Sequence, residues 1–327
     1  MNTAISIVVP VYLGAETLGQ LVEKVLPLTQ STKTKSGNIF EVKEVIFVHD
    51  CGPDKSDEVI EQITRQYAFV KPVWLSKNFG QHPATVAGMA SSRCEWVVTL
   101  DEDLQHDPSE IGSLLDQAIE SGSDVVYGID RKTNVHGFIR TRASSLAKSI
   151  TAALLGSGVA KQYSSYRLIR GNIARGVSAY VGDGVYLDVA LTWVTDCITS
   201  REVVNSVEKR SKSGYTYRKL FSHFLRLLLS NGTKPLRVVT VVGTSIALLG
   251  ILYAVYIVTS ILFTDSAPQG WTSIFASILI IGGFVLMSLG VIAEYLGFVV
   301  RAAFGKPSYF VLQDNRRRHQ QNEAQEG

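Results

Sequence analysis

Three acidic residues follow an apolar run that is typical of a buried strand. The run Trp96–Leu100 is followed directly by Asp101, Glu102 and Asp103. Carboxylates spaced by one residue can share a hard divalent cation, which prefers oxygen ligands and completes its shell with substrate phosphates. Such a cation would neutralise a diphosphate leaving group. The alternative is an acidic turn that only leads into the helix expected from Pro108.

Asp50 is a further acidic residue expected at a strand end. It comes shortly after the apolar run Glu44–Val48, where its carboxylate could accept a hydrogen bond from a base or a ribose. The residues behind it, Gly52–Ser56, have turn chemistry, and Asp54 or Ser56 would cap the next helix. We therefore assign only Asp50 to a ligand.

Two other groups of polar residues could contact a ligand. Asn78 leads into a helix start near Pro83, a potential anion-binding terminus. His82 and His106 are interpreted as polar pocket residues, because no second histidine stands at metal-ligand spacing. Each basic residue is by default solvated, but as a group they suit an anionic headgroup: Arg131, Arg140, Arg142, Arg167, Arg210 and Lys212.

Short β-rich runs alternate with helical patterns around these residues. Strands are predicted at Ile5–Val9, Glu44–Val48, Val73–Leu75, Trp96–Leu100 and Asp124–Tyr127. Helices are predicted at Ala15–Leu28, Ser56–Tyr67, Pro83–Ser92 and Pro108–Ser121. The alternation predicts an α/β fold with a doubly wound, mainly parallel sheet. Ligands of such sheets bind beyond the carboxyl ends of the strands, where the acidic residues stand.

The chain becomes strongly apolar after Lys234. Val238–Thr264 and Trp271–Ala293 contain no charged residue, and each exceeds the roughly 20 apolar residues that cross a bilayer. Lys and Arg flank this pair of runs, whereas the loop Asp265–Gly270 has neither, which predicts cytoplasmic ends. The amphipathic stretch Tyr217–Leu229 predicts a helix lying in the membrane interface, in preference to a core helix.

Charge and cysteine usage exclude several classes of protein. The net charge of +3 in 327 residues is too small to indicate a nucleic-acid partner, and the basic residues beside the apolar runs suit anionic lipids. Three scattered cysteines, Cys51, Cys94 and Cys197, favour a reducing compartment and indicate neither a zinc site nor a disulfide framework. Met1 leads quickly into a strand, so no signal peptide is expected.

Several motifs together resemble the polyprenyl-phosphate glycosyltransferases of glycosyltransferase family 2. The resemblance extends from Ile5 to about Val311 and is completed by the two apolar runs, Gly297 and Lys306–Tyr309. It implies a GT-A fold, Mg²⁺ or Mn²⁺ as the cofactor, a nucleotide-sugar donor and a polyprenyl phosphate acceptor. The motifs are Val8–Tyr12, Glu44–Val48, Asn78–Gln81, Leu100–His106, Tyr166–Ile169 and Arg210–Tyr215.

The resemblance also implies roles for individual residues. The implied catalytic residues are Asp101, Asp103, Gln105 and Arg131, and Gln105 would lie near the sugar or the diphosphate. The donor would be bound by Pro10, Tyr12, Asp50, Asn78 and Asp101. Asp103 and Asp101 would bind the metal. The lipid phosphate would be held by Arg131, Arg140, Arg210 and Lys212.

Three departures from the family pattern affect the donor and the expected base. The family usually has Tyr-Asn-Glu at Tyr12–Gly14, Asp-Asp-Gly-Ser at His49–Gly52, and often Gly-Asp-Phe-Arg at Ser164–Arg167. Ser165 therefore replaces an acidic residue often assigned as catalytic base; Asp183 and Asp188 are candidate substitutes. A phosphate monoester with a second pKa of about 6 is already largely ionised at neutral pH, so it needs positioning more than proton removal.

The sequence thus predicts an inverting glycosyltransferase of cell-envelope polysaccharide synthesis. We expect a cytoplasmic catalytic domain at 1–213, an interfacial helix region at 214–234, a two-helix transmembrane anchor at 235–300 and a cytoplasmic tail at 301–327. A homo-oligomer through the spans is among the expectations. The alternatives are a catalytically degenerate scaffold, or a transferase for another lipid or glycan acceptor.

Two other enzyme classes fit the sequence poorly. A processive polysaccharide synthase would carry a Gln-x-x-Arg-Trp motif and more spans. A nicotinamide-dependent enzyme would have Gly-x-Gly-x-x-Gly where this chain has Pro10–Gly14.

Overall fold

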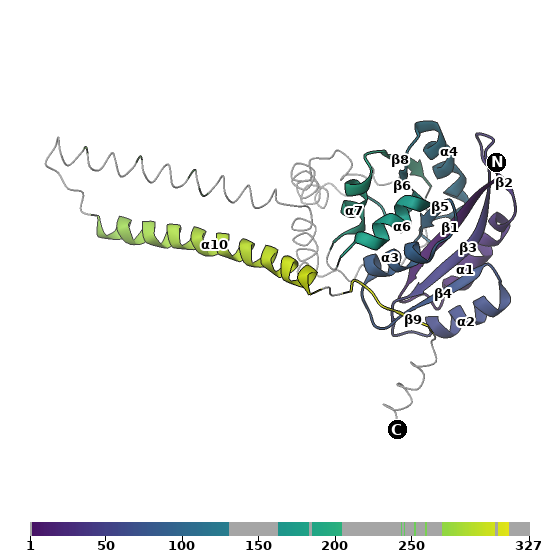
Figure 1. The fold of residues 1–327 in the computed structure, drawn as a ribbon, viewed down its shortest axis with the longest axis horizontal. Coiled ribbons are helices and arrows are strands. Elements are labelled where there is room, and N and C mark those ends of the chain that lie inside the picture. The colour runs from purple at the N-terminus through teal and green to yellow at the C-terminus, as the bar shows by residue number, and fades with distance from the viewer. Residues whose placement is uncertain are drawn as a thin grey trace, which may run out of the picture. The chain divides into compact units, whose positions relative to one another are not determined.

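The computed structural model describes residues 2–130, 163–182, 185–204, 270–304 and 307–313, and the isolated positions 243, 245, 252 and 259. The chain divides into two compact units. One comprises Met1–Tyr217 and Pro307–Gly327, and the other Arg218–Lys306. Figure 1 shows the strands of the first unit and the long helix of the second.

Strands and helices alternate through the first unit, and each strand and helix predicted between Ile5 and Tyr127 is present. The strands are β1 (Asn2–Val11), β2 (Thr32–Lys33), β3 (Ile39–His49), β4 (Val70–Leu75), β5 (Trp96–Thr99), β6 (Val125–Asp130), β7 (Arg167–Arg170), β8 (Ile198–Val203) and β9 (Val311–Leu312). The helices are α1 (Leu18–Val25), α2 (Ser56–Gln66), α3 (Gln81–Ser91), α4 (Ile111–Ser121), α6 (Gly171–Tyr180) and α7 (Leu187–Val194). Short 3-10 turns at Leu26–Thr29 and Pro108–Glu110 follow α1 and precede α4.

Among the described residues, nine strands form one sheet in the order β8-β6-β7-β5-β1-β3-β4-β9, with β2 beside β3. The neighbours β5, β1, β3 and β4 are parallel. β7 runs antiparallel between β5 and β6, so the sheet is mixed where we expected it to be mainly parallel. The carboxyl ends of the four parallel neighbours meet at one edge, which places the residues after them together.

Helices cover both faces of the sheet, as a doubly wound fold requires. Ile7 and Val9 of β1 belong to one apolar core, with residues of α1, α2 and α4. Val8 belongs to a second core, with residues of α3, α6 and α7. This alternation follows from the two-residue period of a strand. All three side chains are fully buried, and each contributes about 1.5–3 kcal/mol of burial free energy.

The chain returns to this sheet after the second unit. β9 pairs antiparallel with β4, with Leu312 opposite Trp74 and Val311 opposite Leu75. The amide of Ser76 donates to the carbonyl of Phe310 at 3.0 Å. This strand lies in the region that we expected to be a tail, and it covers the outer edge of β4, which would otherwise offer unpaired backbone groups.

The second unit contains α10 (Trp271–Ala303), which includes the second apolar run. In the part of the chain that the structure describes, no helix meets the length and hydropathy needed to cross a membrane. Apart from isolated positions, the first apolar run, Val238–Thr264, lies outside the described residues. The same holds for Tyr217–Leu229 and for Arg131, Arg140, Arg142, Asp183, Arg210 and Lys212.

Candidate active site

A cavity of about 420 Å³ opens at the carboxyl edge of the parallel strands. Its lining includes the residues predicted for donor and metal binding, which come from the ends of β1, β3, β4 and β5 and the loops that follow them. Gln105 lies outside this lining, with an exposed side chain. The lining residues are Pro10, Val11, Tyr12, Asp50, Asn78, Gly80, Gln81, Asp101, Glu102 and Asp103.

The loops after β1 and β3 form one wall of this cavity because their backbones approach closely. The amide of Asp50 donates to the carbonyl of Val11 at 2.8 Å. A Cβ atom on Gly52 would lie 1.6 Å from the carbonyl oxygen of Tyr12, so only glycine fits there. The turn predicted at Gly52–Ser56 therefore also fixes the position of Tyr12.

Asp50 organises the neighbouring wall. Its buried carboxylate accepts hydrogen bonds from the amides of Phe79 and Gly80, both at 2.7 Å. These bonds hold the loop that carries Asn78 and Gln81 to the cavity. We predicted Asp50 as a ligand residue only, and the structure adds this supporting role. A carboxylate has about four lone-pair sites, so a ligand hydrogen bond remains feasible.

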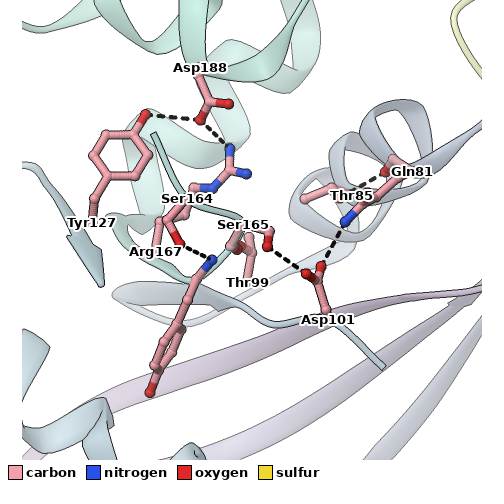
Figure 2. Close-up of polar contacts among 10 residues, drawn as sticks. Gln81, Thr85, Thr99, Asp101, Tyr127, Ser164, Ser165, Arg167 and Asp188 are labelled. Carbon is pink, nitrogen blue, oxygen red and sulfur yellow. Dashed lines mark hydrogen bonds and ion pairs between the residues drawn. The ribbon is translucent and has the colours of Figure 1, made fainter. Parts of the chain in front are cut away.

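The acidic loop after β5 forms a further part of the lining. Oδ1 of Asp101 accepts a hydrogen bond from Nε2 of Gln81 at 2.6 Å, and Oδ2 accepts one from the hydroxyl of Ser165 at 2.5 Å (Figure 2). Leu104 is buried and has a φ of 62°, an uncommon conformation for leucine that turns the chain behind Asp103. The amide of Gln105 then donates to Oδ1 of Asp103 at 3.2 Å.

Asp101 and Asp103 are the two carboxylates of this cavity that we predicted to bind a metal. Within the described ranges, no group of three or more His, Cys, Asp or Glu side chains is arranged to hold a metal ion. Two carboxylates on one cavity wall nevertheless fit a hard cation such as Mg²⁺, which is commonly held by one or two carboxylates plus substrate phosphates.

His106 packs against the acidic loop, and the amide of Asp101 donates to its Nδ1 at 3.4 Å. Its ring stacks on Tyr166, with ring centroids 5.0 Å apart, and Nδ1 lies 4.0 Å from Oδ2 of Asp101. Burial lowers the pKa of His106, although the charges of Asp101 and Asp103 act in the opposite direction. The ring is therefore largely neutral at pH 7. We predicted His106 as a polar pocket residue, but it is buried behind the acidic loop and lines neither of these two cavities, whereas His82 lines the smaller one described below.

A smaller cavity of about 180 Å³ adjoins the first and shares Gln81 and Asp101 with it. Seven further side chains complete its lining, and most are neutral hydrogen-bonding groups. Among them, Ser165 lies in the segment that leads into β7, and its carbonyl accepts from the hydroxyl of Thr99 at 2.6 Å. The seven are His82, Thr85, Tyr163, Ser164, Ser165, Arg167 and Asp188.

A buried ion pair forms part of the wall of the smaller cavity. Nη1 of Arg167 donates to Oδ1 of Asp188 at 2.7 Å, and the hydroxyl of Tyr127 donates to the same oxygen at 3.0 Å (Figure 2). Burial raises the pKa of Tyr127 well above its usual value, and Asp188 adds to the effect. Nε of Arg167 is buried and has no hydrogen-bond partner among the described residues. Asp188, which we considered as a substitute base, is thus engaged by two donors.

Comparison with known proteins identifies the family to which this chain belongs. Residues 6–177 match the model of Glycosyl transferase family 2, so the chain belongs to that family and is a glycosyltransferase. Residues 234–299 match the GtrB C-terminal hairpin. A crystal structure of a mycobacterial protein superposes with a TM-score of 0.50 at 20% identity, over 71% of this chain and 74% of that one. The mixed, doubly wound sheet is GT-A-like.

Relatives match over almost the whole chain. An undecaprenyl-phosphate 4-deoxy-4-formamido-L-arabinose transferase of Edwardsiella ictaluri is 27% identical over 98% of this chain and 97% of its own length. A SfII prophage-derived bactoprenol glucosyl transferase of Shigella flexneri is 25% identical over 95% of this chain and 98% of its own. These names agree with the resemblance to polyprenyl-phosphate glycosyltransferases.

Proposed function

We propose that the protein transfers a sugar from a nucleotide-sugar donor to a polyprenyl phosphate at the cytoplasmic face of a membrane, with inversion at the anomeric carbon. The observation that carries this proposal is the cavity in which Asp101 and Asp103 face Pro10, Tyr12 and Asp50. It offers carboxylates and polar loops at the strand ends, where a GT-A-like sheet binds its ligands. The full-length match to lipid-phosphate sugar transferases supports this acceptor class.

The donor diphosphate is proposed to lie against the acidic loop. A bound Mg²⁺ or Mn²⁺, held by Asp103 and Asp101, would supply charge neutralisation for the departing diphosphate. The protein contributes a fixed geometry: Gln81 and Ser165 hold Asp101 from two sides, and Asp50 holds the loop of Asn78. Such preorganisation lets the site stabilise charge without rearranging during the reaction.

The smaller cavity suits the sugar better than the acceptor phosphate. Its only cation among the described lining residues, Arg167, is paired with Asp188, and Asp101 adds a further negative charge. A phosphate dianion would gain little there, whereas Thr85, Ser164 and the other neutral groups can bind sugar hydroxyls. The acceptor phosphate is proposed to approach from the basic residues outside the described ranges: Arg131, Arg140, Arg210 and Lys212.

Because that phosphate is largely ionised at neutral pH, it can attack the anomeric carbon without a general base. This reading accommodates Ser165 at the position where an acid was expected. Direct displacement from the face opposite the diphosphate inverts the anomeric configuration.

The carboxy-terminal part is proposed to anchor the enzyme in the membrane, with both termini cytoplasmic. The hairpin match over 234–299 coincides with the two uncharged runs, and the flanking charges follow the positive-inside rule. A reporter after Gln313 should be cytoplasmic, and a tag near Pro268 should be accessible from outside. A loop tag that is protected while the tail is exposed outside would reverse the proposed orientation.

The function is tested with the full chain in detergent, undecaprenyl phosphate and a panel of nucleotide sugars. We expect release of nucleoside diphosphate that requires both Mg²⁺ or Mn²⁺ and the lipid phosphate. Release that needs a different lipid or a glycan would change the acceptor class. A protein that releases no nucleotide with any combination would be the degenerate scaffold.

A further inference from the structure

Glu102 is the acidic residue between the two proposed metal ligands, yet its carboxylate binds the backbone of another loop. Oε2 accepts a hydrogen bond from the amide of Tyr12 at 2.9 Å. The amide of Leu13 donates to both carboxylate oxygens, at 3.0 Å to Oε1 and 3.2 Å to Oε2. Glu102 thereby joins the loop after β5 to the loop after β1, which lies 89 to 90 residues earlier in the chain.

Gly14 leaves the space that this carboxylate occupies. A Cβ atom built on Gly14 would lie 2.7 Å from Oε2 of Glu102. It would also lie 2.9 Å from a methyl carbon of Val11 and 3.0 Å from Leu18, so the position is closed on three sides. The family pattern usually has a glutamate at the position of Gly14. In this chain the space beside Gly14 is occupied by the carboxylate of Glu102, which comes from a distant loop.

The two amides belong to a run of four that are all satisfied by side chains. The amide of Gly14 donates to the hydroxyl of Ser56, and that of Ala15 to Oδ2 of Asp54, both at 3.0 Å. Successive backbone N–H groups in a loop form a concave surface that favours an anion. Here the anions are carboxylates of the protein itself, so the loop is fixed before any donor binds.

We propose that Glu102 is a positioning residue of the donor site, which sets the width of the larger cavity between Tyr12 on one wall and Asp101 and Asp103 on the other. The inference rests on the proposed function, because it assumes that a nucleotide diphosphate lies between these walls. In this proposal the carboxylate of Glu102 accepts hydrogen bonds from the backbone of Tyr12 and Leu13 and does not bind the metal.

The test compares Glu102→Ala and Glu102→Gln with the full-length wild type in detergent. Amide hydrogen exchange of the peptide that contains Tyr12 and Leu13 should be faster in Glu102→Ala and intermediate in Glu102→Gln, which keeps one acceptor oxygen. Losing these charge-assisted bonds should raise the donor KM about tenfold, with the KM for lipid phosphate unchanged. Glu95→Gln is the matched control, because Glu95 is an exposed glutamate immediately before β5, at the end of the strand away from the acidic loop.

The inference is overturned if exchange at this loop is unchanged, or if exchange rises while the donor KM stays at the wild-type value. Should Glu102→Ala fail to fold, Glu102→Gln alone decides between these outcomes. If the wild type shows no transfer at all, the proposed function fails, whereas the exchange result still shows whether Glu102 holds the loop. In that case, thermal stabilisation by Mn²⁺ with UDP or GDP replaces the kinetic measurement, and it should be weaker in both variants than in Glu95→Gln.

Discussion

The hydroxyl of Ser165 lies 2.5 Å from Oδ2 of Asp101, and it donates a hydrogen bond across a separation of 64 residues. A serine at this position holds the carboxylate of Asp101 on the side opposite Gln81. An acidic residue there would place a second carboxylate against Asp101. Ser165 therefore has the geometry of a positioning residue and not of a proton acceptor.

Ser165→Ala should reduce transfer about tenfold, since it removes one hydrogen bond to a charged group. The pH dependence of the rate should keep the wild-type shape, because no titrating group is lost. Steady-state rates across pH measure both effects, and Ser109→Ala, at an exposed position, provides the control. A loss of several orders of magnitude with a changed pH profile would show that Ser165 takes part in proton transfer.

Asp103→Asn should nearly abolish transfer while the fold is retained, because it removes one charge from a hard-cation site. Asp101→Asn should act more visibly on the donor KM. Activity is measured at saturating Mg²⁺ and Mn²⁺, with Asp196→Asn as an exposed control. Substantial activity of Asp103→Asn at saturating metal would remove Asp103 from the metal site.

Asp188→Asn should destabilise the first unit by about 3–5 kcal/mol, the range for breaking a buried ion pair from one side. The reason is that Arg167, 3% exposed, would keep its charge without its partner. Replacing both residues, as Arg167→Met with Asp188→Leu, should cost less than the sum of the single changes. Denaturant titration measures these free energies of unfolding, and full additivity would show that the two charges are not coupled.

The stability of the protein should depend on pH through Glu44. Burial raises the pKa of this carboxyl, but hydrogen bonds from Lys71, Ser6 and the amide of Arg93 outweigh it, so the net pKa lies below the usual 4.5. A lowered folded-state pKa adds stability above the unfolded-state pKa, and this stability is lost as the pH falls through the folded-state value. The stability advantage over Glu44→Gln should therefore be largest at neutral pH and shrink in acid.

Thermal midpoints of the wild type and Glu44→Gln between about pH 7 and pH 3 test this linkage. Glu95→Gln again serves as the control, since its exposed side chain has no comparable set of partners in the described structure. A difference between wild type and Glu44→Gln that stays constant over the whole range would show that Glu44 does not contribute to the acid sensitivity.

Much of the fold was readable from the sequence because its strands and helices have strong local patterns. Asp50 and Asp101 each follow an apolar run that forms a strand, and the parallel pairing of these strands with β1 brings both carboxylates to one cavity. β7 was not predicted, since a strand of four residues with an arginine at each end carries little periodicity. Its antiparallel position depends on partners far away in the chain, which a local pattern does not encode.

The same limit applies to the contacts that hold the site together. The sequence singled out Asp101, but the bonds from Gln81 and Ser165 depend on tertiary structure. The loss of a polar residue at Gly14 was visible, whereas its replacement by Glu102 from another loop was not. Arg167 was grouped with the basic residues that suit an anionic headgroup, and the structure buries it against Asp188.

The pairing of β9 with β4 has a consequence for the order in which the fold is completed. The second unit is an insertion: the chain leaves the first unit after β8 and re-enters it at β9, and these strands lie at the two ends of the sheet order. The sheet of the first unit therefore contains a strand that comes later in the chain than the whole of the second unit. During synthesis this sheet is completed only after the second unit has been made, and a chain that ends before β9 would leave β4 as the margin of the sheet.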